Sequence, residues 1–272
     1  MQADRLGRFL FQSGYRFTHI FSSDLERAFK TAKAIRFAQP SKDSSVSVPD
    51  IKPLSLLREQ DFGYYEGKPF YTRDRDSKKS GKDNHRAKNV NDPDFKDVES
   101  KDAMEIRMRS FLIEHIIPAL RNNNSVKEPV VAIVSHGIIL STLWKCLLKR
   151  FEAQSVKLAR GLNIGNGGYL SLEHLGGWSN TGYLELDIQG STLVHTIDVI
   201  DAIHPSTNHD DDAAKDDAST LLVGWQMIVK TINGKEHLQN LKRTGGGVGS
   251  SKYDEGQRKI ETFFVSKKAK TG

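Results

Sequence analysis

The most constraining stretch of this sequence is a run of five apolar residues at 130–134, four of them β-branched. Such a run is typical of a strand buried on both faces of a parallel sheet. The run ends at Ser135-His136-Gly137, and leucines at helical spacing follow it. Because ligands collect at the carboxyl ends of strands in open α/β sheets, His136 is a candidate functional residue. The alternative, for this segment alone, is a histidine that caps the end of a core strand.

Composition limits the class of protein. Hydrophobic residues fill 37% of the 272 positions and the mean hydropathy is −0.51, which predicts substantial disordered sequence beside a folded domain. The single cysteine, Cys146, excludes a disulfide framework and a cysteine-based zinc site. The sequence has no apolar run as long as a membrane span and no signal-peptide pattern after Met1. We therefore expect a soluble intracellular protein.

The net charge of +6 belongs to the C-terminal part of the chain. Residues 224–272 contain ten Lys and Arg against four Asp and Glu, so the remainder is balanced. Direct nucleic-acid binding by the folded part is therefore not expected. Residues 203–222 read as an acidic linker and residues 223–272 as a disordered basic tail. This leaves a folded domain at 1–202 with a polar insertion at 68–101.

The spacing of apolar residues predicts alternating helices and strands, which is typical of an α/β fold. Helices are expected at 2–12, from Asp24 to Ile35, from Glu99 to Leu120 and from Gly137 to Arg150. Strands are expected at 17–21, 54–57, 130–134, 168–175 and 183–188.

Two further segments place charged side chains at the ends of expected strands. Ser22-Ser23-Asp24 supplies helix-capping chemistry, and Arg27 falls in the first turn of the helix that follows. Free backbone N–H groups and the helix dipole make that position suitable for a phosphate. Glu59 follows an extended segment and precedes a glycine-containing turn. An isolated arginine at such a position is more often a solvated surface charge. The hypothesis of a phosphate site therefore depends on Arg27, Glu59 and His136 occurring together.

Together these segments resemble the histidine phosphatase superfamily, in its phosphoglycerate mutase-like branch. The matching sequences, in the family's order, are SSDLERAFKTA at 22–32, LREQDFGYYEG at 57–67, VESKDAMEIRMRSF at 98–111 and VAIVSHG at 131–137. The resemblance implies a three-layer α/β/α sandwich. It also implies phosphoryl transfer through a phosphohistidine, without a metal or an organic cofactor.

The resemblance assigns roles to three residues of this chain. Arg27 would hold the phosphate, His136 would be the second histidine that binds it during catalysis, and Glu59 would be the general acid. Fixed positive charge around the phosphoryl oxygens and a proton donor for the leaving oxygen are what this reaction needs. Glu66 is a second candidate for the acid, disfavoured by its place beyond the turn.

The sequence departs from the family at its nucleophile. The family carries that histidine in an Arg-His-Gly motif at the end of a first strand, and none of the nine histidines here lies in such a motif. The expected fold therefore lacks its first strand. Two explanations stay open: an incomplete version of an active enzyme, which we favour, or a genuine short form without turnover. In either case we expect negligible phosphatase activity from these 272 residues.

The tail contains a second motif, at 257–264. Gln257, Ile260, Phe263 and Phe264 match the pattern of the peptide that docks on the DNA sliding clamp, PCNA. A disordered segment of this kind can fold into one turn on binding, with its apolar side chains filling a pocket and its basic neighbours steering it towards an acidic surface. The alternatives are that Phe263 and Phe264 fold back on the domain or that the match arises by chance. The motif favours a nuclear or nucleocytoplasmic protein.

The sequence thus predicts a phosphomonoester hydrolase tethered to the sliding clamp by its tail. The alternative is a non-catalytic phosphate-binding or adaptor protein that binds the clamp. The sequence does not separate phosphatase from mutase. The segment after Gly67, which would shape the pocket of a mutase, is unlike ordinary sugar-phosphate pockets, and the acidic linker and the basic insertion favour a phosphatase.

Overall fold

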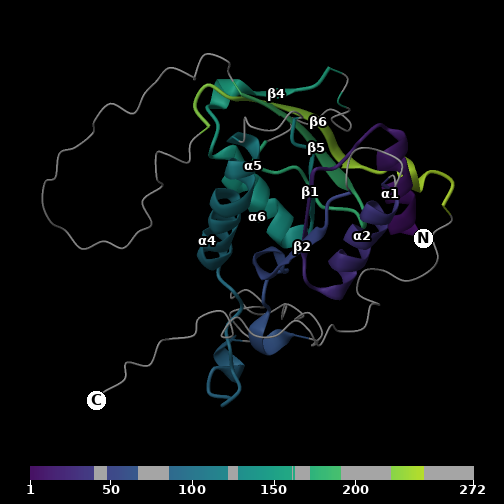
Figure 1. The fold of residues 1–272 in the computed structure, drawn as a ribbon. Coiled ribbons are helices and arrows are strands. Elements are labelled where there is room, and N and C mark those ends of the chain that lie inside the picture. The colour runs from purple at the N-terminus through teal and green to yellow at the C-terminus, as the bar shows by residue number, and fades with distance from the viewer. Residues whose placement is uncertain are drawn as a thin grey trace, which may run out of the picture.

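The computed structural model describes residues 1–39, 48–66, 86–121, 128–160, 162, 172–190 and 222–241. They form a layered α/β structure with two three-stranded sheets (Figure 1). The first sheet has the order β2-β1-β3 and contains β1 (His19–Ser23), β2 (Ile51–Leu54) and β3 (Val131–Val134). Its strands are all parallel. The α/β sandwich expected from the sequence is therefore confirmed.

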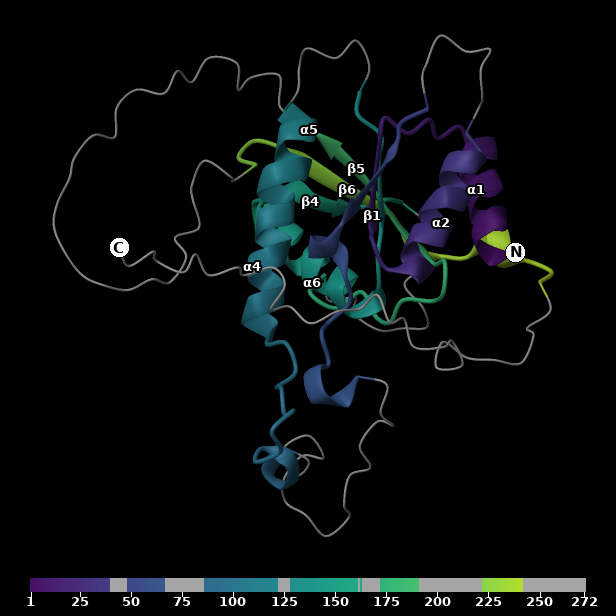
Figure 2. The same cartoon turned by 60° about the horizontal axis from the view of Figure 1, so that its bottom comes forward.

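Helices cover both faces of this sheet (Figure 2). α1 (Gln2–Gln12) and α2 (Glu26–Phe37) lie together on one side. They pack very closely, since a Cβ atom added to Gly7 would lie 2.5 Å from the carbonyl oxygen of Ala34. The other side carries α4 (Lys101–Phe111), η3 (Leu112–Ile116), α5 (Ile117–Arg121) and α6 (Gly137–Leu148).

The second sheet has the order β4-β6-β5. It is built from β4 (Val156–Leu158), β5 (Tyr183–Gln189) and β6 (Gln226–Gly234). β6 runs parallel to β4 and antiparallel to β5. The expected strand at 183–188 is therefore confirmed. Of the strand expected at 168–175, residues 168–171 lie outside the described residues, and 172–175 are not in a strand.

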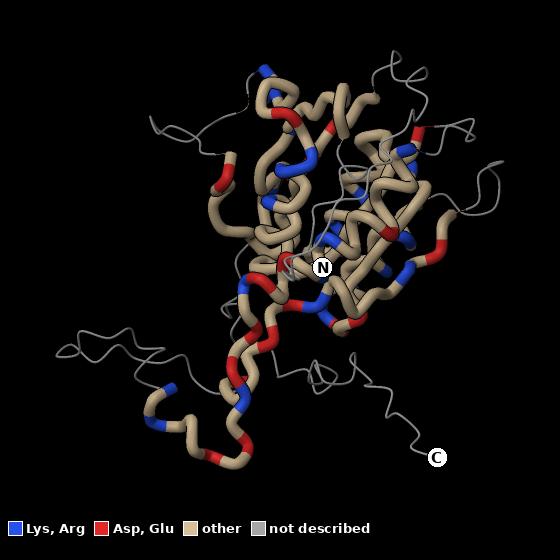
Figure 3. Tube along the Cα trace, turned by 90° about the vertical axis from the view of Figure 1, so that its left-hand side faces the viewer, with Lys and Arg blue, Asp and Glu red and all other residues tan. Residues whose placement is uncertain are grey.

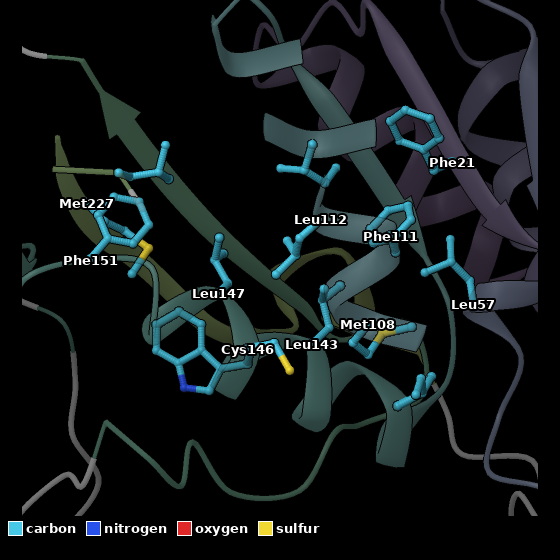
Figure 4. Close-up of a cluster of buried hydrophobic side chains, with 14 of the residues drawn as sticks. Phe21, Leu57, Met108, Phe111, Leu112, Leu143, Cys146, Leu147, Phe151 and Met227 are labelled. Carbon is cyan, nitrogen blue, oxygen red and sulfur yellow. The ribbon is translucent and has the colours of Figure 1, made fainter. Parts of the chain in front are cut away.

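The main core lies between the first sheet, α4 and α6, and continues to the second sheet (Figure 4). Phe21 of β1 meets Phe111 of α4 edge to face, with ring centroids 5.7 Å apart. Met108 and Leu57 are fully buried beside them, and Met227 of β6 closes the far end. Cys146 is buried here, as its place in the helical run indicated.

The long helix expected from Glu99 to Leu120 is confirmed: helical residues run without a break from Lys101 to Arg121, although one turn among them is not α-helical. It begins one turn into the motif at 98–111, with Ser100 as its N-cap accepting a hydrogen bond from the Ala103 amide at 3.1 Å. After Phe111 the chain widens into one π-type turn, η3, before α5. Pro118 in α5 has no N–H to donate, which accounts for the irregular hydrogen bonding just before it. No described helix is both long and apolar enough to cross a membrane.

The described part of the polar insertion forms an arm that extends from the body (Figures 2 and 3). The Tyr64 amide donates to the Lys96 carbonyl at 2.9 Å, and the Glu99 amide donates to the Asp61 carbonyl at 2.7 Å. Gly63 has φ +56° and its backbone touches that of Lys96 and Asp97, so a side chain there would clash. The base of the arm is therefore a closely paired structure, whereas 67–85 lie outside the described residues.

The prediction of a disordered tail from residue 223 is wrong for its first part. β6 and the 3-10 turn η7 (Glu236–Leu238) are ordered parts of the body. Met227 and Val229 have no exposed surface, because β6 fills the centre of the second sheet, and Leu222, just before β6, is also fully buried. Composition did not indicate this, since the segment becomes buried only against partners that are distant in the sequence. Residues 203–221 and 242–272 lie outside the described residues.

Candidate active site

Three segments meet at the carboxyl end of the first sheet. His136 follows β3, Arg27 lies in the first turn of α2, and Glu59 follows the 3-10 turn η1 (Ser55–Leu57). All three residues line the same cavity, whose volume is about 1890 Å³. The structure therefore brings together the three residues selected from the sequence.

His136 is buried and stands at the N-cap position of α6, with an extended backbone. Its Nε2 atom lies 3.0 Å from the Ser23 hydroxyl at the end of β1, and its carbonyl accepts the Leu140 amide at 2.9 Å. The imidazole is thus oriented by two elements at once: α6 fixes its backbone and β1 fixes its ring.

The capping expected from Ser22-Ser23-Asp24 takes a different form. Leu25 occupies the N-cap position of α2 and makes no side-chain cap. The Ser23 hydroxyl accepts the Leu25 amide at 3.2 Å, and Asp24 accepts two hydrogen bonds of 2.7 Å from Arg58. This ion pair ties the start of α2 to the segment that carries Glu59. Arg27 itself is exposed at the cavity wall.

Glu59 is bonded to the start of α6. Its carboxylate accepts the amides of Ile139 at 3.1 Å and Ile138 at 3.3 Å, together with its own neighbour Gln60 at 3.0 Å. The first amides of a helix have no partner within the helix and attract negative charge. Glu59 therefore completes the N-terminus of α6 from a distant part of the sequence.

Arg107 of α4 is a residue of this region that the sequence reasoning did not single out. Its guanidinium donates to the carbonyls of Leu56 at 2.6 Å, Arg58 at 2.7 Å and Glu59 at 3.2 Å. The same group makes a two-pronged ion pair with Glu99, whose side chain is 2% exposed. The signal was present in the motif at 98–111, which contains both residues, but spacing alone could not show what they bind.

Ser135 holds the same turn from the opposite side. Its hydroxyl donates to the Leu57 carbonyl at 2.6 Å. The backbone that presents Glu59 is therefore fixed by α4 on one side and by the end of β3 on the other.

Glu66, the second candidate acid, accepts the Phe62 amide at 2.9 Å within its own turn and is not among the cavity-lining residues. Among the described residues there is no cluster of three His, Cys, Asp or Glu side chains that could hold a metal ion. The clamp-peptide residues Gln257, Ile260, Phe263 and Phe264 lie outside the described residues.

A carboxylate on β5 also lines the cavity. Glu185 accepts hydrogen bonds from Tyr15 and Thr231 and pairs with Lys230 at 2.7 Å. Burial raises the pKa of this carboxyl, but the bonds from Lys230, Tyr15 and Thr231 outweigh burial and leave the pKa below its usual range. Burial and the neighbouring Glu185 raise the pKa of Tyr15. Glu185 is thus a paired carboxylate of the cavity wall.

Comparison with known proteins places these features in context. The family model described as "Histidine phosphatase superfamily (branch 1)" matches residues 1–179. Two curated relatives named "Fructose-2,6-bisphosphatase TIGAR" are similar, from Xenopus tropicalis (45% identical over 82 residues) and Xenopus laevis (46% over 81 residues). Each match covers 29% of this chain and 27% of the relative, so the chain matches about a quarter of the relatives' length.

Solved structures with a similar arrangement include "Mycobacterial hydrolase 1", at 16% identity and a TM-score of 0.48, covering 86% of this chain and 84% of that one. A mycobacterial glucosyl-3-phosphoglycerate phosphatase with inorganic phosphate has 20% identity and a TM-score of 0.42, covering 69% of this chain and 76% of that one.

Proposed function

We propose, from the premise that this chain belongs to the histidine phosphatase superfamily (branch 1), that it is a phosphomonoester hydrolase built around His136. The observation that carries the proposal is the convergence of His136, Arg27 and Glu59 on one cavity. An imidazole, a guanidinium and a carboxyl group around one hollow provide two phosphate-binding groups and one proton donor.

In the proposed reaction a nucleophilic histidine forms a bond to phosphorus while the bond from phosphorus to the ester oxygen breaks. Arg27 and His136 stabilise the phosphoryl oxygens, and Glu59 delivers its proton to the leaving oxygen. Water then attacks the phosphohistidine, releasing phosphate and regenerating the imidazole. In the structure Glu59 accepts amides of α6, so its acid role requires a protonated carboxyl that turns from these amides towards the substrate.

The mechanism needs a nucleophilic histidine, which the family carries in an Arg-His-Gly motif. These 272 residues do not contain that motif. We therefore expect the purified 272-residue chain to hydrolyse p-nitrophenyl phosphate negligibly. Robust hydrolysis that is lost in His136→Ala would contradict this expectation, because it would mean that these residues suffice for turnover.

Phosphate binding tests the site separately from turnover. Titration with inorganic phosphate, followed by calorimetry, should show saturable binding that weakens about tenfold or more in His136→Ala and in Arg27→Ala, since each removes a charge-assisted hydrogen bond. Lys33→Ala is the matched control, because Lys33 lies on α2 but stacks on Phe29 outside the cavity lining. Equal affinity in all four proteins would refute the assignment of this cavity.

The proposal extends to the class of substrate, a phosphomonoester, and favours hydrolysis over mutase chemistry. The curated relatives are named for hydrolysis of a sugar bisphosphate, which makes sugar phosphates the first compounds to profile. Profiling uses a version of the chain that contains the nucleophile, with release of phosphate as the readout. Transfer of the phosphoryl group to a second sugar position, in place of release, would favour the mutase.

A second function is supported by the pattern at 257–264. We propose that Gln257, Ile260, Phe263 and Phe264 dock on the sliding clamp PCNA and tether the protein in the nucleus. A synthetic peptide of residues 253–269 should bind the clamp, and replacement of Phe263 and Phe264 by alanine should abolish binding because they supply the buried apolar surface. Undetectable binding at high micromolar peptide would refute the tether.

If the clamp peptide binds and a nucleophile-containing version still releases no phosphate from any ester, the adaptor alternative replaces the hydrolase. Phosphate binding at His136 would then serve recognition without turnover.

A further inference from the structure

The hydroxyl group of Ser23 contacts both of the segments that present the proposed phosphate-binding residues. Ser23 ends β1 and has no exposed surface. Its Oγ atom lies 3.0 Å from Nε2 of His136 and accepts the Leu25 amide at 3.2 Å. Leu25 is the N-cap residue of α2, whose first turn carries Arg27. One buried hydroxyl therefore contacts the ring of His136 and the start of the helix that presents Arg27.

The first sheet fixes the backbone of Ser23 on both sides. Ser23 stands opposite Leu54 of β2. Its neighbour Ser22 stands opposite Val134 of β3, and His136 follows two residues later. The Ser22 hydroxyl also donates to the Ser23 carbonyl at 2.8 Å. The place of the Ser23 hydroxyl relative to the end of β3 is therefore set by paired strands rather than by a loop.

The hydrogen-bonding capacity of a hydroxyl group determines which partner donates here. A serine hydroxyl has one proton to donate and can accept two hydrogen bonds. The Leu25 amide only donates, so it uses one acceptor position of Ser23. Among the described residues, Nε2 of His136 is the other partner of this hydroxyl, and the only one of the two that can accept its proton. Since buried polar groups are paired in folded proteins, Ser23 should donate to Nε2.

This donation fixes the position of the proton on the imidazole. If Nε2 accepts a hydrogen bond, it carries no proton, and a neutral imidazole then carries its proton on Nδ1. In the reverse arrangement Nε2 would donate to Ser23. The hydroxyl would then accept two hydrogen bonds, and its own proton would have no acceptor among the described residues. Only the first arrangement satisfies the hydroxyl.

We propose that Ser23 is a positioning residue that holds the neutral ring of His136 with its proton on Nδ1 and, through the Leu25 amide, fixes the start of the helix that carries Arg27. The oxygens of a phosphate dianion only accept hydrogen bonds, so Nδ1–H is the donor that this ring offers to them. The place of the proton follows from the hydrogen bonds of the structure, whereas its use in phosphate binding rests on the proposed function.

Nuclear magnetic resonance of the full 272-residue chain tests the position of the proton. The histidine rings are labelled with nitrogen-15, and the signals of His136 are those that disappear in His136→Ala. At about pH 9, where an ordinary histidine is neutral, we expect a proton on Nδ1 and none on Nε2. A proton on Nε2 would overturn the proposal. This measurement needs no change at Ser23, so it is decisive even if a Ser23 variant fails to fold.

Substitutions at two neighbouring serines test the cause. Ser23→Ala removes the hydroxyl and should increase the population of the ring with its proton on Nε2, whereas Ser23→Thr keeps a hydroxyl and should preserve the proton on Nδ1. Ser22→Ala is the matched control, because Ser22 is equally buried on the same strand and its hydroxyl bonds to a backbone carbonyl. An unchanged ring in Ser23→Ala, or the same change in Ser22→Ala, would overturn the proposal.

Titration with inorganic phosphate separates this inference from the proposed function. Phosphate binding should weaken about three- to tenfold in Ser23→Ala, because the hydrogen bond that orients the ring is lost, and it should be unchanged in Ser22→Ala. If the unsubstituted chain and Ser23→Ala bind phosphate equally well, the positioning role is refuted and the proposed function stands. If the unsubstituted chain binds no phosphate, but its Nδ1 proton is lost in Ser23→Ala, the proposed function fails and the control of the ring by Ser23 stands.

Discussion

The two ends of the large cavity are constructed differently. At the end with His136, each backbone segment is tied by several hydrogen bonds, from Arg107, Ser135 and Glu59. Along β3 and β5, the wall consists mainly of half-buried side chains, and among the described residues each of these strands pairs with one neighbour. The difference teaches that hydrogen bonds from α4, α6 and the end of β3 fix the backbone at the His136 end, whereas β3 and β5 contribute mainly half-buried side chains to the wall. Substitutions can therefore test the two regions separately.

Removal of Arg107 should have the largest effect on stability. Arg107→Ala would leave the buried Glu99 carboxylate unpaired and three carbonyls without their donor, so we expect a loss of about 3–5 kcal/mol. Urea unfolding measures this loss of stability. The matched control is Arg109→Ala on the same helix, whose more exposed pair with Glu105 spans 3.6 Å and should contribute about 1 kcal/mol or less. Similar losses of stability in the two variants would mean that the buried ion pair of Arg107 contributes no more than the more exposed pair of Arg109, which would contradict the prediction.

Truncation of apolar side chains should distinguish the packed core from the cavity wall. Met108 is fully buried, and Met108→Ala should lose about 2–5 kcal/mol of stability because it leaves a closed cavity. Ile133 is half-buried and lines the existing cavity, so Ile133→Ala should lose less than half of that. Urea unfolding measures both losses. Equal losses at Ile133 and Met108 would mean that the wall is packed as tightly as the core.

Glu59→Gln should have a smaller effect. It keeps the shape of the side chain and an acceptor oxygen while removing the charge at the start of α6, which should reduce stability by about 0.5–1 kcal/mol. Ser100→Ala, which removes the N-cap of α4, provides a reference of about 1 kcal/mol. Loss of helicity in α6 far beyond that reference would mean that Glu59 does more than cap the helix.

The smallest expected effect is a dependence of stability on pH that arises from His237, a residue of η7. Its ring lies 6.1 Å from Phe9 of α1, and its Nε2 atom is 2.9 Å from the Thr181 hydroxyl. Burial lowers the pKa of His237 below its usual 6.5. The unfolded chain therefore binds more protons just below pH 6.5, so stability should fall as the pH is lowered through that range.

Hydrogen exchange at residues 236–238 between pH 7 and pH 5 measures the effect at His237. His237→Asn should flatten the pH dependence. If the pH dependence of exchange is unchanged in the variant, another group causes it. His115 would then be the next candidate, because burial also lowers its pKa.

Much of the first sheet could be predicted from the sequence. The run at 130–134 and the apolar spacing around Phe21 mark strands because these side chains must leave water wherever the chain goes. Arg27, Glu59 and His136 were found because each follows such a segment, and parallel strands place their carboxyl ends together. The second sheet was harder to predict from the sequence. β6 pairs in parallel with β4 and antiparallel with β5, so its stability comes from contacts distant in the sequence, and composition marked it as tail.

The sequence by itself determined which residues gather at the carboxyl end of the first sheet, because local hydrophobic periodicity and the alternation of strands and helices dictate that order. The tertiary structure alone decided how they are held. Arg107 binds three carbonyls of a turn about fifty residues away, and Glu59 caps a helix that begins 78 residues later. It also decided that β3 and β5, about fifty residues apart in the sequence, line the same cavity. Hydrogen bonds between distant segments depend on where packing places them, and no local pattern encodes that placement.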